Sequence, residues 1–189
     1  MSNEKLETQV VTPKFRMSWP SLLAAKTNRL NGKEQFEITM VFPEGADLTE
    51  LKKAAEHAAI NKWGIGKIPK GLRSPFRNGD EDSYKKYPEF AGKTIIRAST
   101  STPPGVVDHK VQPVLDGKEV YGGRWAIAQV NAGAYDQAGN KGVSFYINHV
   151  QLLDHDKSFG GASRPEDVFQ KTAIQGTSAK TDDQEDIFK

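Results

Sequence analysis

The sequence predicts a mainly β fold, a small barrel or sandwich of short strands that carries one inserted α-helix. Apolar and polar residues alternate with period two in several separate stretches, which is the pattern of half-buried strands. Gly, Pro and Asn-Gly turn signals separate these stretches at short spacing, and only one stretch has the period of a helix. A chain of 189 residues can bury one sizeable core, so we expect a single folded domain.

The first two strands lie on either side of a polar turn. Residues 14–19 alternate and predict a half-buried strand that is stopped by Pro20. Trp19 falls on the apolar face of this strand, so we expect it in the core. After a turn at 28–33, the alternation returns over 36–42 and predicts the second strand.

The inserted helix is predicted over residues 47–63. Asp47 is a suitable N-cap, and Glu50 follows three residues later, as in a capping box. Leucine and alanine residues then recur at helical spacing, and Gly64 is a suitable C-terminal stop.

Three further strands are predicted in the second half of the chain, over 93–99, 124–135 and 143–152. The strand at 124–135 has one face of small apolar residues, which we expect to pack inward, against the helix. Its opposite face carries rings and amides, which is unusual for a surface that only meets water. A turn at 136–142 joins it to the last strand.

Both ends of the chain are polar. We expect residues 1–13 to be flexible, residues 14–169 to form the folded domain, and residues 170–189 to form a disordered acidic tail. Residues 1–165 carry 23 basic and 18 acidic side chains, whereas residues 166–189 carry 3 basic and 6 acidic ones. A basic body with an acidic tail indicates a polyanionic partner and a tail that can compete with it.

The segment from Lys62 to Phe90 is the best candidate for contact with that partner. Five cations lie between Lys62 and Arg77 with no acidic residue among them, and five rings lie within or just beyond this run. Cations that hold phosphates, interleaved with rings on which bases stack, are what an unpaired nucleic-acid strand requires of a groove. A solvated basic loop whose rings are buried in the core is the alternative interpretation.

Eleven residues are predicted to contact the unpaired nucleic-acid strand. Six offer charges for phosphates and five offer rings for bases, either in the basic segment or on the predicted strands. They are Arg73, Arg77, Tyr84, Lys85, Lys86, Tyr87, Arg124, Trp125, Tyr135, Lys141 and Tyr146.

Other function classes find little support in the sequence. The four histidines have no metal-ligand spacing, and there is no phosphate-binding GxxxxGK[ST] loop and no nucleophile elbow, so we expect no enzyme, no metal and no cofactor. Cysteine is absent, there is no apolar run of about 18 residues, and the first residues lack a secretion signal. We therefore expect a protein of the cytoplasm that does not enter a membrane.

Several stretches, in order, resemble a family of single-stranded DNA-binding proteins of tailed bacteriophages. These stretches are KWGIGKIPKGLRSPFRNGDE, YPEFAG, PPGVVD, YGGRW, YDQAGNKGVSFYINHVQ and GGASRPEDVF, and the likeness spans roughly Lys14 to Phe169. The resemblance implies an oligonucleotide-binding (OB) fold, a five-stranded barrel, here enlarged by the inserted helix. It also implies sequence-independent binding of single-stranded DNA in phage replication or recombination, in the cytoplasm of a host bacterium.

The acidic tip resembles the tails with which many bacterial and phage single-stranded DNA-binding proteins dock replication partners. The residues that carry this likeness are Asp182, Asp183, Glu185, Asp186, Ile187 and Phe188. Lys189 follows the phenylalanine, whereas the resembled tails end on the aromatic residue. A tail that only confers solubility is the alternative.

Two rival functions remain open at the level of sequence. The same surface could bind another phage protein, in which case the chain would have a tight protein partner and no affinity for DNA. It could also bind RNA, because ring platforms seldom distinguish the two sugars.

Overall fold

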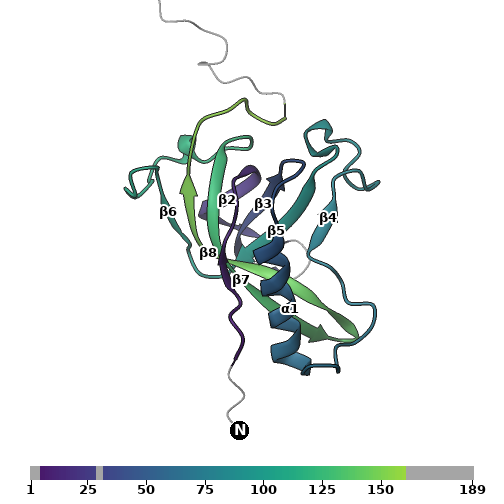
Figure 1. The fold of residues 1–189 in the computed structure, drawn as a ribbon. Coiled ribbons are helices and arrows are strands. Elements are labelled where there is room, and N and C mark those ends of the chain that lie inside the picture. The colour runs from purple at the N-terminus through teal and green to yellow at the C-terminus, as the bar shows by residue number, and fades with distance from the viewer. Residues whose placement is uncertain (1–4, 29–31, 161–189) are drawn as a thin grey trace, which may run out of the picture.

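The computed structural model describes residues 5–28 and 32–160, which form eight strands and one α-helix (Figure 1). The elements in chain order are β1 (Gln9–Val11), β2 (Phe15–Thr27), β3 (Glu34–Phe42), α1 (Thr49–Trp63), β4 (Phe76–Asn78), the short 3-10 helix η1 (Pro88–Phe90), β5 (Thr94–Thr100), β6 (Gly105–Val107), the 3-10 helix η2 (Gly117–Glu119), β7 (Trp125–Gln137) and β8 (Asn140–Leu152).

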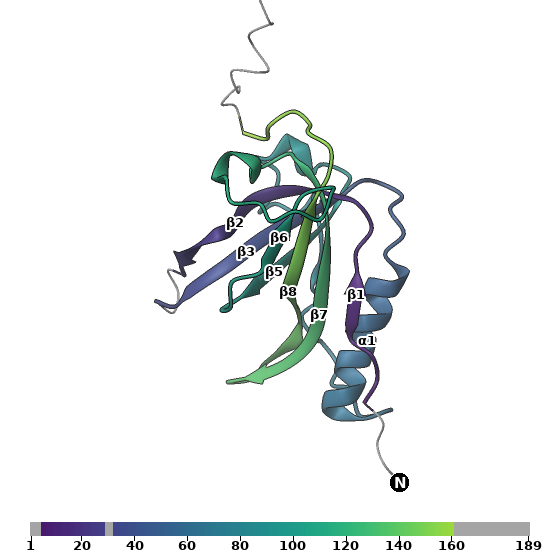
Figure 2. The ribbon, with the colours of Figure 1, turned by 90° about the vertical axis from the view of Figure 1, so that its left-hand side faces the viewer.

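Five of the strands close into a ring. β2 pairs with β3, β3 with β5, β8 with β7 and β7 with β2, all antiparallel, while β5 and β8 pair in parallel. Seen from the side, the long β7–β8 hairpin and the β2–β3 hairpin extend from this ring in different directions (Figure 2). A closed ring of five strands is the barrel of the OB fold, so the predicted fold class is confirmed.

Alternation along the strands decides which side chains fill the barrel. The even-numbered residues of β3 and β5 point inward, and the odd-numbered ones point outward, because successive residues of a strand face opposite sides. The small apolar face of β7 is buried, as predicted. Large residues that are fully enclosed include Phe15, Met17, Ile38, Met40, Phe42, Ile96, Phe145 and Leu152.

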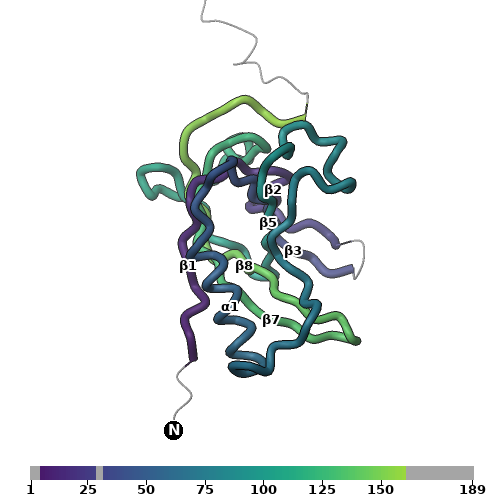
Figure 3. The backbone as a smooth tube through the Cα atoms, turned by 45° about the vertical axis from the view of Figure 1, so that its right-hand side comes forward, coloured from purple at the N-terminus to yellow at the C-terminus, as the bar shows by residue number. Residues whose placement is uncertain are grey.

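Helix α1 covers one side of the barrel, against β7 and β8, and runs beside β1 (Figure 3). Its leucine and alanine stripe is buried in the same core cluster as the alanines of β7. The helix begins at Thr49, two residues later than predicted, and the Asp47 carboxylate accepts the backbone N–H of Thr49 at 3.0 Å. It ends at Trp63, and the next residue, Gly64, has a positive φ of 90° that favours glycine.

The N-terminal segment is more ordered than the sequence suggests. β1 pairs with the middle of β7, and the side-chain amide of Asn61 on α1 both accepts from and donates to the backbone of Leu6. The expectation of a flexible segment over 1–13 is therefore wrong for the part that pairs. Short strands of this kind form through partners distant in the sequence, which local patterns do not reveal.

Strand β2 does not stop at Pro20 but continues to Thr27. The pairing with β3 shifts between Ser18 and Ser21, so Pro20 lies in a β-bulge, where its missing N–H costs no ladder hydrogen bond. Trp19, expected in the core, is 41% exposed at this bulge.

The turn between β7 and β8 is tighter than the predicted 136–142. The two strands pair as far as Gln137 and Asn140, and both intervening residues, Ala138 and Gly139, have positive φ, as in a two-residue hairpin turn. The short strands β4 and β6 were not predicted. The predicted acidic tail lies outside the described residues.

Candidate nucleic-acid interface

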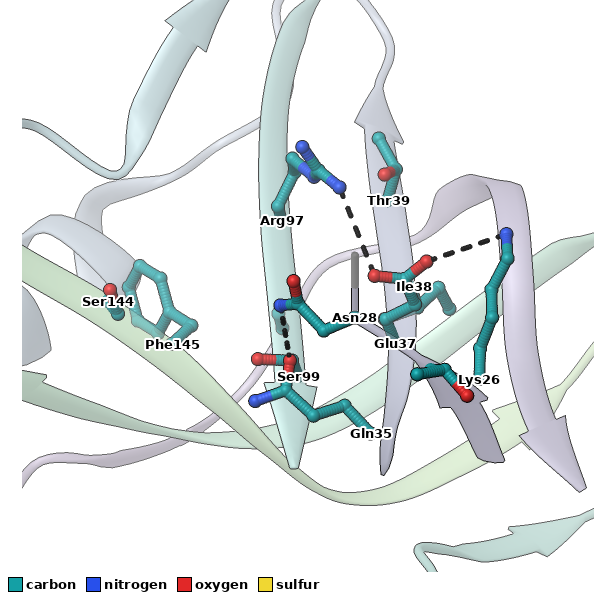
Figure 4. A pocket seen from close by; sticks show the side chains of 12 residues that line it. Lys26, Asn28, Gln35, Glu37, Ile38, Thr39, Arg97, Ser99, Ser144 and Phe145 are labelled. Atoms are coloured by element: carbon teal, nitrogen blue, oxygen red, sulfur yellow. Dashed lines mark hydrogen bonds and ion pairs between the residues drawn. The ribbon is translucent and has the colours of Figure 1, made fainter. Parts of the chain in front are cut away.

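A hollow of about 510 Å³ lies on the outer face of the barrel, over β2, β3, β5 and β8. The outward residues of β3 and β5 form its floor, since Thr39 is opposite Arg97 and Glu37 is opposite Ser99. Lys26 and Asn28 border it from β2 and the turn that follows, and Ser144 borders it from β8 (Figure 4). Polar and charged side chains line it together with the apolar Ile38, Ala98 and Phe145.

Two cations in this hollow flank one carboxylate. The Glu37 carboxylate lies 3.8 Å from Lys26 Nζ and 3.9 Å from Arg97 Nη2 (Figure 4). The Lys26 and Arg97 side chains are 64% and 65% exposed, so each ion pair is weak, of about 0–1 kcal/mol. A phosphate can therefore exchange with Glu37 at either cation.

An aromatic cluster adjoins the hollow along the same two strands. Val41 and Ile95 also face outward, but η1 and the loop before it cover them with Phe90, which is fully buried. Tyr84 and Tyr87 pack their rings on Phe90 with centroids 5.5 and 5.4 Å away. Both predicted contact rings are thus partly used in holding this loop on the sheet.

Three other predicted cations, Arg73, Lys85 and Lys86, lie on the surface. Arg73 is exposed, and its backbone bonds to Lys141 and Val143, which fastens the loop to β8. Lys85 pairs with Asp82 at 2.6 Å, and the ammonium of Lys86 lies 5.1 Å from the ring centre of Tyr87.

Arg77 on β4 is held by a carboxylate. Its guanidinium Nε donates to both oxygens of Glu81, at 3.0 and 3.2 Å, and Nη2 donates to the same group. The Arg77 hydrogen bond, together with the N–H of Asn78, keeps the pKa of Glu81 below its usual value. Arg77 therefore stabilises the start of the loop and offers DNA less charge than its formal unit.

The β7–β8 hairpin continues the outer face beyond β5. Tyr146 is opposite Ser99 of β5 and is 44% exposed. A Cβ on Gly133 would lie 2.6 Å from its Cε2 but 3.4 and 3.6 Å from the two bonded ring atoms, which indicates an approach along the ring edge. The ring of Tyr146 thus rests by its edge on β7, and its faces are directed along the surface.

Tyr135 and Lys141 lie nearer the tip of this hairpin. The Tyr135 hydroxyl lies over Gly142, where a Cβ would come within 2.6 Å of it. The Lys141 ammonium pairs with Asp136 at 3.4 Å across the two strands. Both side chains are partly exposed and adjoin the outer face.

A second hollow, of about 440 Å³, lies farther along the outer face of β7 and β8. Its lining is rich in amides, from Gln9, Gln129, Asn131 and Asn148. The imidazole of His149 and the hydroxyls of Thr100 and Thr102 also line it. Since Tyr146 is opposite both Ser99 and Asn131, the ring lies between the two hollows.

The structure corrects the prediction for Arg124. This side chain is buried, with 4% of the residue exposed, and its guanidinium donates to the carbonyls of Leu153 and Glu119 and to the Glu119 carboxylate. Those bonds join the start of β7 to the segment after β8, so Arg124 has a structural role and does not reach a phosphate.

Trp125, next to Arg124, is also held by contacts within the protein. Its indole N–H donates to Asp156 at 2.8 Å, and the Arg16 guanidinium lies 5.8 Å from its ring centre. Tyr146 is opposite Asn131, about 20 Å along β7 from Trp125, so the two rings do not form a common platform.

Two residues that line the hollow were missed, Lys26 and Arg97, and so was the exposure of Trp19. A signal for Arg97 was available, because a charged residue between alternating apolar residues of a strand must face outward. Lys26 and Trp19 depended on how far β2 extends past Pro20, which local propensity misjudged.

Within residues 5–28 and 32–160, no three potential ligands gather as a metal site would require. In the same residues, no helix is both long and apolar enough to span a bilayer.

Comparison with known proteins gives consistent matches. The model of the family described as Enterobacter phage Enc34, ssDNA-binding protein, matches residues 8–186. Protein p50 of Acyrthosiphon pisum secondary endosymbiont phage 1 is 29% identical over 156 residues, which cover 77% of this chain and 83% of that protein.

Among the solved structures that share the fold are two phage proteins. The single-stranded DNA-binding protein of bacteriophage Enc34, in complex with ssDNA, superposes with a TM-score of 0.70 at 22% identity, over 81% of this chain and 90% of that one. Gp2.5, a single-stranded DNA-binding protein encoded by bacteriophage T7, gives a TM-score of 0.57 at 14% identity, over 89% and 98% of the two chains.

Proposed function

Because the chain belongs to the family of the Enterobacter phage Enc34 ssDNA-binding protein, we propose that it binds single-stranded DNA without sequence preference, along the outer face of its barrel. The observation that supports this placement best is the hollow over β3 and β5, in which Lys26 and Arg97 hold only a weakly bound carboxylate. OB folds bind oligonucleotides on the face of their second and third strands, and β3 and β5 are the second and third strands of this ring.

The proposed path of the strand crosses the barrel. Phosphates meet Lys26 and Arg97 in the first hollow, and a base stacks on a face of Tyr146 where β5 meets β8. The strand then enters the amide-rich second hollow, which offers hydrogen bonds without charge. Stacking on a ring tolerates any base, which accounts for binding without sequence preference.

The surface cations around this path supply the long-range attraction. Arg73, Lys85, Lys86 and Lys141 are near the two hairpins and the aromatic cluster, and we keep them as peripheral phosphate contacts. Tyr135 remains a candidate ring at the hairpin tip. Arg77, Tyr84 and Tyr87 mainly hold the loop that borders the hollow, and Arg124 and Trp125 are left out of the interface.

The biological role that we propose is protection of unpaired strands in phage replication or recombination, in the cytoplasm of the host bacterium. This role requires no catalytic step, so we expect no enzymatic activity. We also propose that Asp182, Asp183, Glu185, Asp186, Ile187 and Phe188 dock replication or recombination proteins. Replacing the four acidic residues by their amides should then raise DNA affinity at low salt and abolish capture of such a partner.

The test is a fluorescence anisotropy titration of labelled oligo-dT, the same sequence as a duplex, and oligo-rU, over a series of salt concentrations. We expect a strong preference for the single DNA strand. For about 4–6 phosphates neutralised, the slope of log K against log salt should be about −3 to −4. Equal binding of the duplex, or a slope near zero, would contradict the proposal, and tighter binding of oligo-rU would identify RNA as the ligand.

One substitution tests whether the hollow itself binds the DNA. Arg97→Ala should weaken binding and make the slope shallower by about 0.7, the contribution of one phosphate on a single strand. Lys53→Ala on the exposed side of α1 removes the same charge outside the hollow and should leave the slope unchanged. Equal effects of the two variants would mean that only the net charge matters.

A further inference from the structure

Trp19 lies in a strained part of β2. Its φ of 44° falls in the left-handed region, which residues other than Gly, Asn and Asp rarely adopt. It also precedes Pro20, and the residue before a proline strongly prefers extended backbone. Strain of this kind persists only where the surrounding structure holds it, and it gathers at functional sites.

The strain has a geometric result. Between Ser18 and Ser21, β2 advances three residues while β3 advances two, from Thr39 to Glu37, so β2 contains one extra residue. Without it, Trp19 would follow Phe15 and Met17, both fully buried, into the barrel. The bulge instead directs the indole to the outer face, where 41% of the residue is exposed.

The indole is fixed in that position by other rings. Its centroid lies 4.8 Å from that of Tyr87 and 5.3 Å from that of Phe90, with interplanar angles of 72° and 74°. Within residues 5–28 and 32–160, no hydrogen-bond acceptor meets its N–H, whereas the N–H of Trp125 is bound by Asp156. Trp19 is therefore partly exposed and keeps an available donor.

Trp19 does not line the cationic hollow, but the cluster on which it packs is next to it on the same strands. The cluster on which it packs has Val41 and Ile95 as its floor, and the next outward pair on the same strands is Thr39 and Arg97. Two residues of a strand span about 7 Å. The cluster under Trp19 and the pair that includes Arg97 are therefore neighbours on the same face of β3 and β5, so one strand of DNA can reach both.

We propose that Trp19 is a nucleobase-stacking residue, held outward by the bulge at Pro20, and that it marks the end of the DNA path opposite to Tyr146. This assignment rests on the proposed binding of single-stranded DNA and adds a contact to it. The bound group is a nucleobase of any type, because an indole stacks on every base.

Intrinsic fluorescence gives a direct test, since the chain has only three tryptophans, at 19, 63 and 125. Titration of the full-length protein with oligo-dT should quench its tryptophan emission. Trp19→Phe, which keeps a ring in the cluster, should lose most of this quenching, whereas the matched variant Trp125→Phe should keep it. Quenching in Trp19→Phe equal to that of the unaltered protein would overturn the proposal.

Affinity for an abasic strand separates stacking from folding. Trp19→Ala should weaken oligo-dT binding about 5- to 150-fold, the effect of losing one stacked base. An oligonucleotide of the same length with every base replaced by tetrahydrofuran should bind this variant and the unaltered protein equally. A loss of the same size with the abasic strand would show that the substitution damages the fold or the phosphate contacts, and would refute stacking on Trp19.

These outcomes are distinct from a failure of the proposed function itself. If the unaltered protein bound no single-stranded DNA, the proposed function would fail. If it bound single-stranded DNA well and the Trp19 variants behaved like the unaltered protein in both assays, only the stacking role of Trp19 would be refuted.

Discussion

Replacement of Glu37 by glutamine should tighten the binding of single-stranded DNA. Glu37 lies between Lys26 and Arg97, at 3.8 and 3.9 Å, and it carries a negative charge into a hollow that we assign to phosphates. A bound phosphate must displace this carboxylate from the cations and then remain near it. Glu37→Gln removes both costs while keeping the side chain's shape.

The size of the effect follows from the distances. A phosphate held by both cations would lie about 6 Å from the Glu37 carboxylate, where two unit charges repel by about 0.7 kcal/mol in water and about 2.8 kcal/mol at an effective dielectric constant of about 20. This range corresponds to affinity about 3- to 100-fold higher for Glu37→Gln. Salt screens charges over about 10 Å at 0.1 M, so the gain should shrink as salt is raised.

The assay is anisotropy of labelled oligo-dT at several salt concentrations, with Glu56→Gln as the control. Glu56 is exposed on α1, outside the hollow, so its replacement makes the same change of net charge elsewhere. Unchanged or weaker binding by Glu37→Gln, or an equal gain in both variants, would refute the assignment of this hollow to phosphates.

Three further predictions concern other parts of the molecule. Gly133→Ala should displace the ring edge of Tyr146, because the new Cβ would come within 2.6 Å of Cε2, and should weaken oligo-dT binding measurably by anisotropy. Arg124→Met should lower the free energy of unfolding in urea by about 1–3 kcal/mol, the cost of losing buried hydrogen bonds, with DNA affinity kept. The pKa of Glu81 is lowered by Arg77, so their contact should stabilise the loop fully above pH 4.5 and be lost only as the pH falls below that value, as hydrogen exchange of residues 76–93 can measure.

Each of these has a control. Gly117→Ala adds a Cβ where nothing lies within 4 Å, so it should leave binding unchanged, and Gly133→Ala should have no further effect in a Tyr146→Ala background. If the Arg124→Met variant folded but bound oligo-dT more weakly, Arg124 would belong to the DNA interface. In Glu81→Gln the acid-dependent loosening of the loop should disappear, and its persistence would point to another carboxylate.

The sequence by itself determined the elements whose signals are local. Alternation over 36–42 and 124–135, and the alanine stripe with its glycine stop at Gly64, identified two barrel strands and the helix. These patterns are reliable because the periodicity of a strand or helix determines which face each successive residue lies on. The family could also be predicted from the sequence, because its motifs are continuous stretches that occur in a fixed order.

The site depended on which elements meet in space. The sequence indicated the basic segment as the site because its charges are adjacent along the chain. The hollow is instead lined by Lys26 of β2, Glu37 of β3 and Arg97 of β5, which are far apart in the sequence. Arg124 illustrates the reverse case, since a cation next to a tryptophan looked exposed and is bonded to the Leu153 carbonyl.

Only the tertiary structure decided the direction of Trp19 and the continuation of β2 past Pro20. Local propensity stops a strand at proline, whereas pairing with β3 carries β2 onward through a bulge. The free energy of that pairing comes from residues distant in the sequence. For this reason the sequence determined the strands and the family, and the closure of the ring determined which side chains form the surface for DNA.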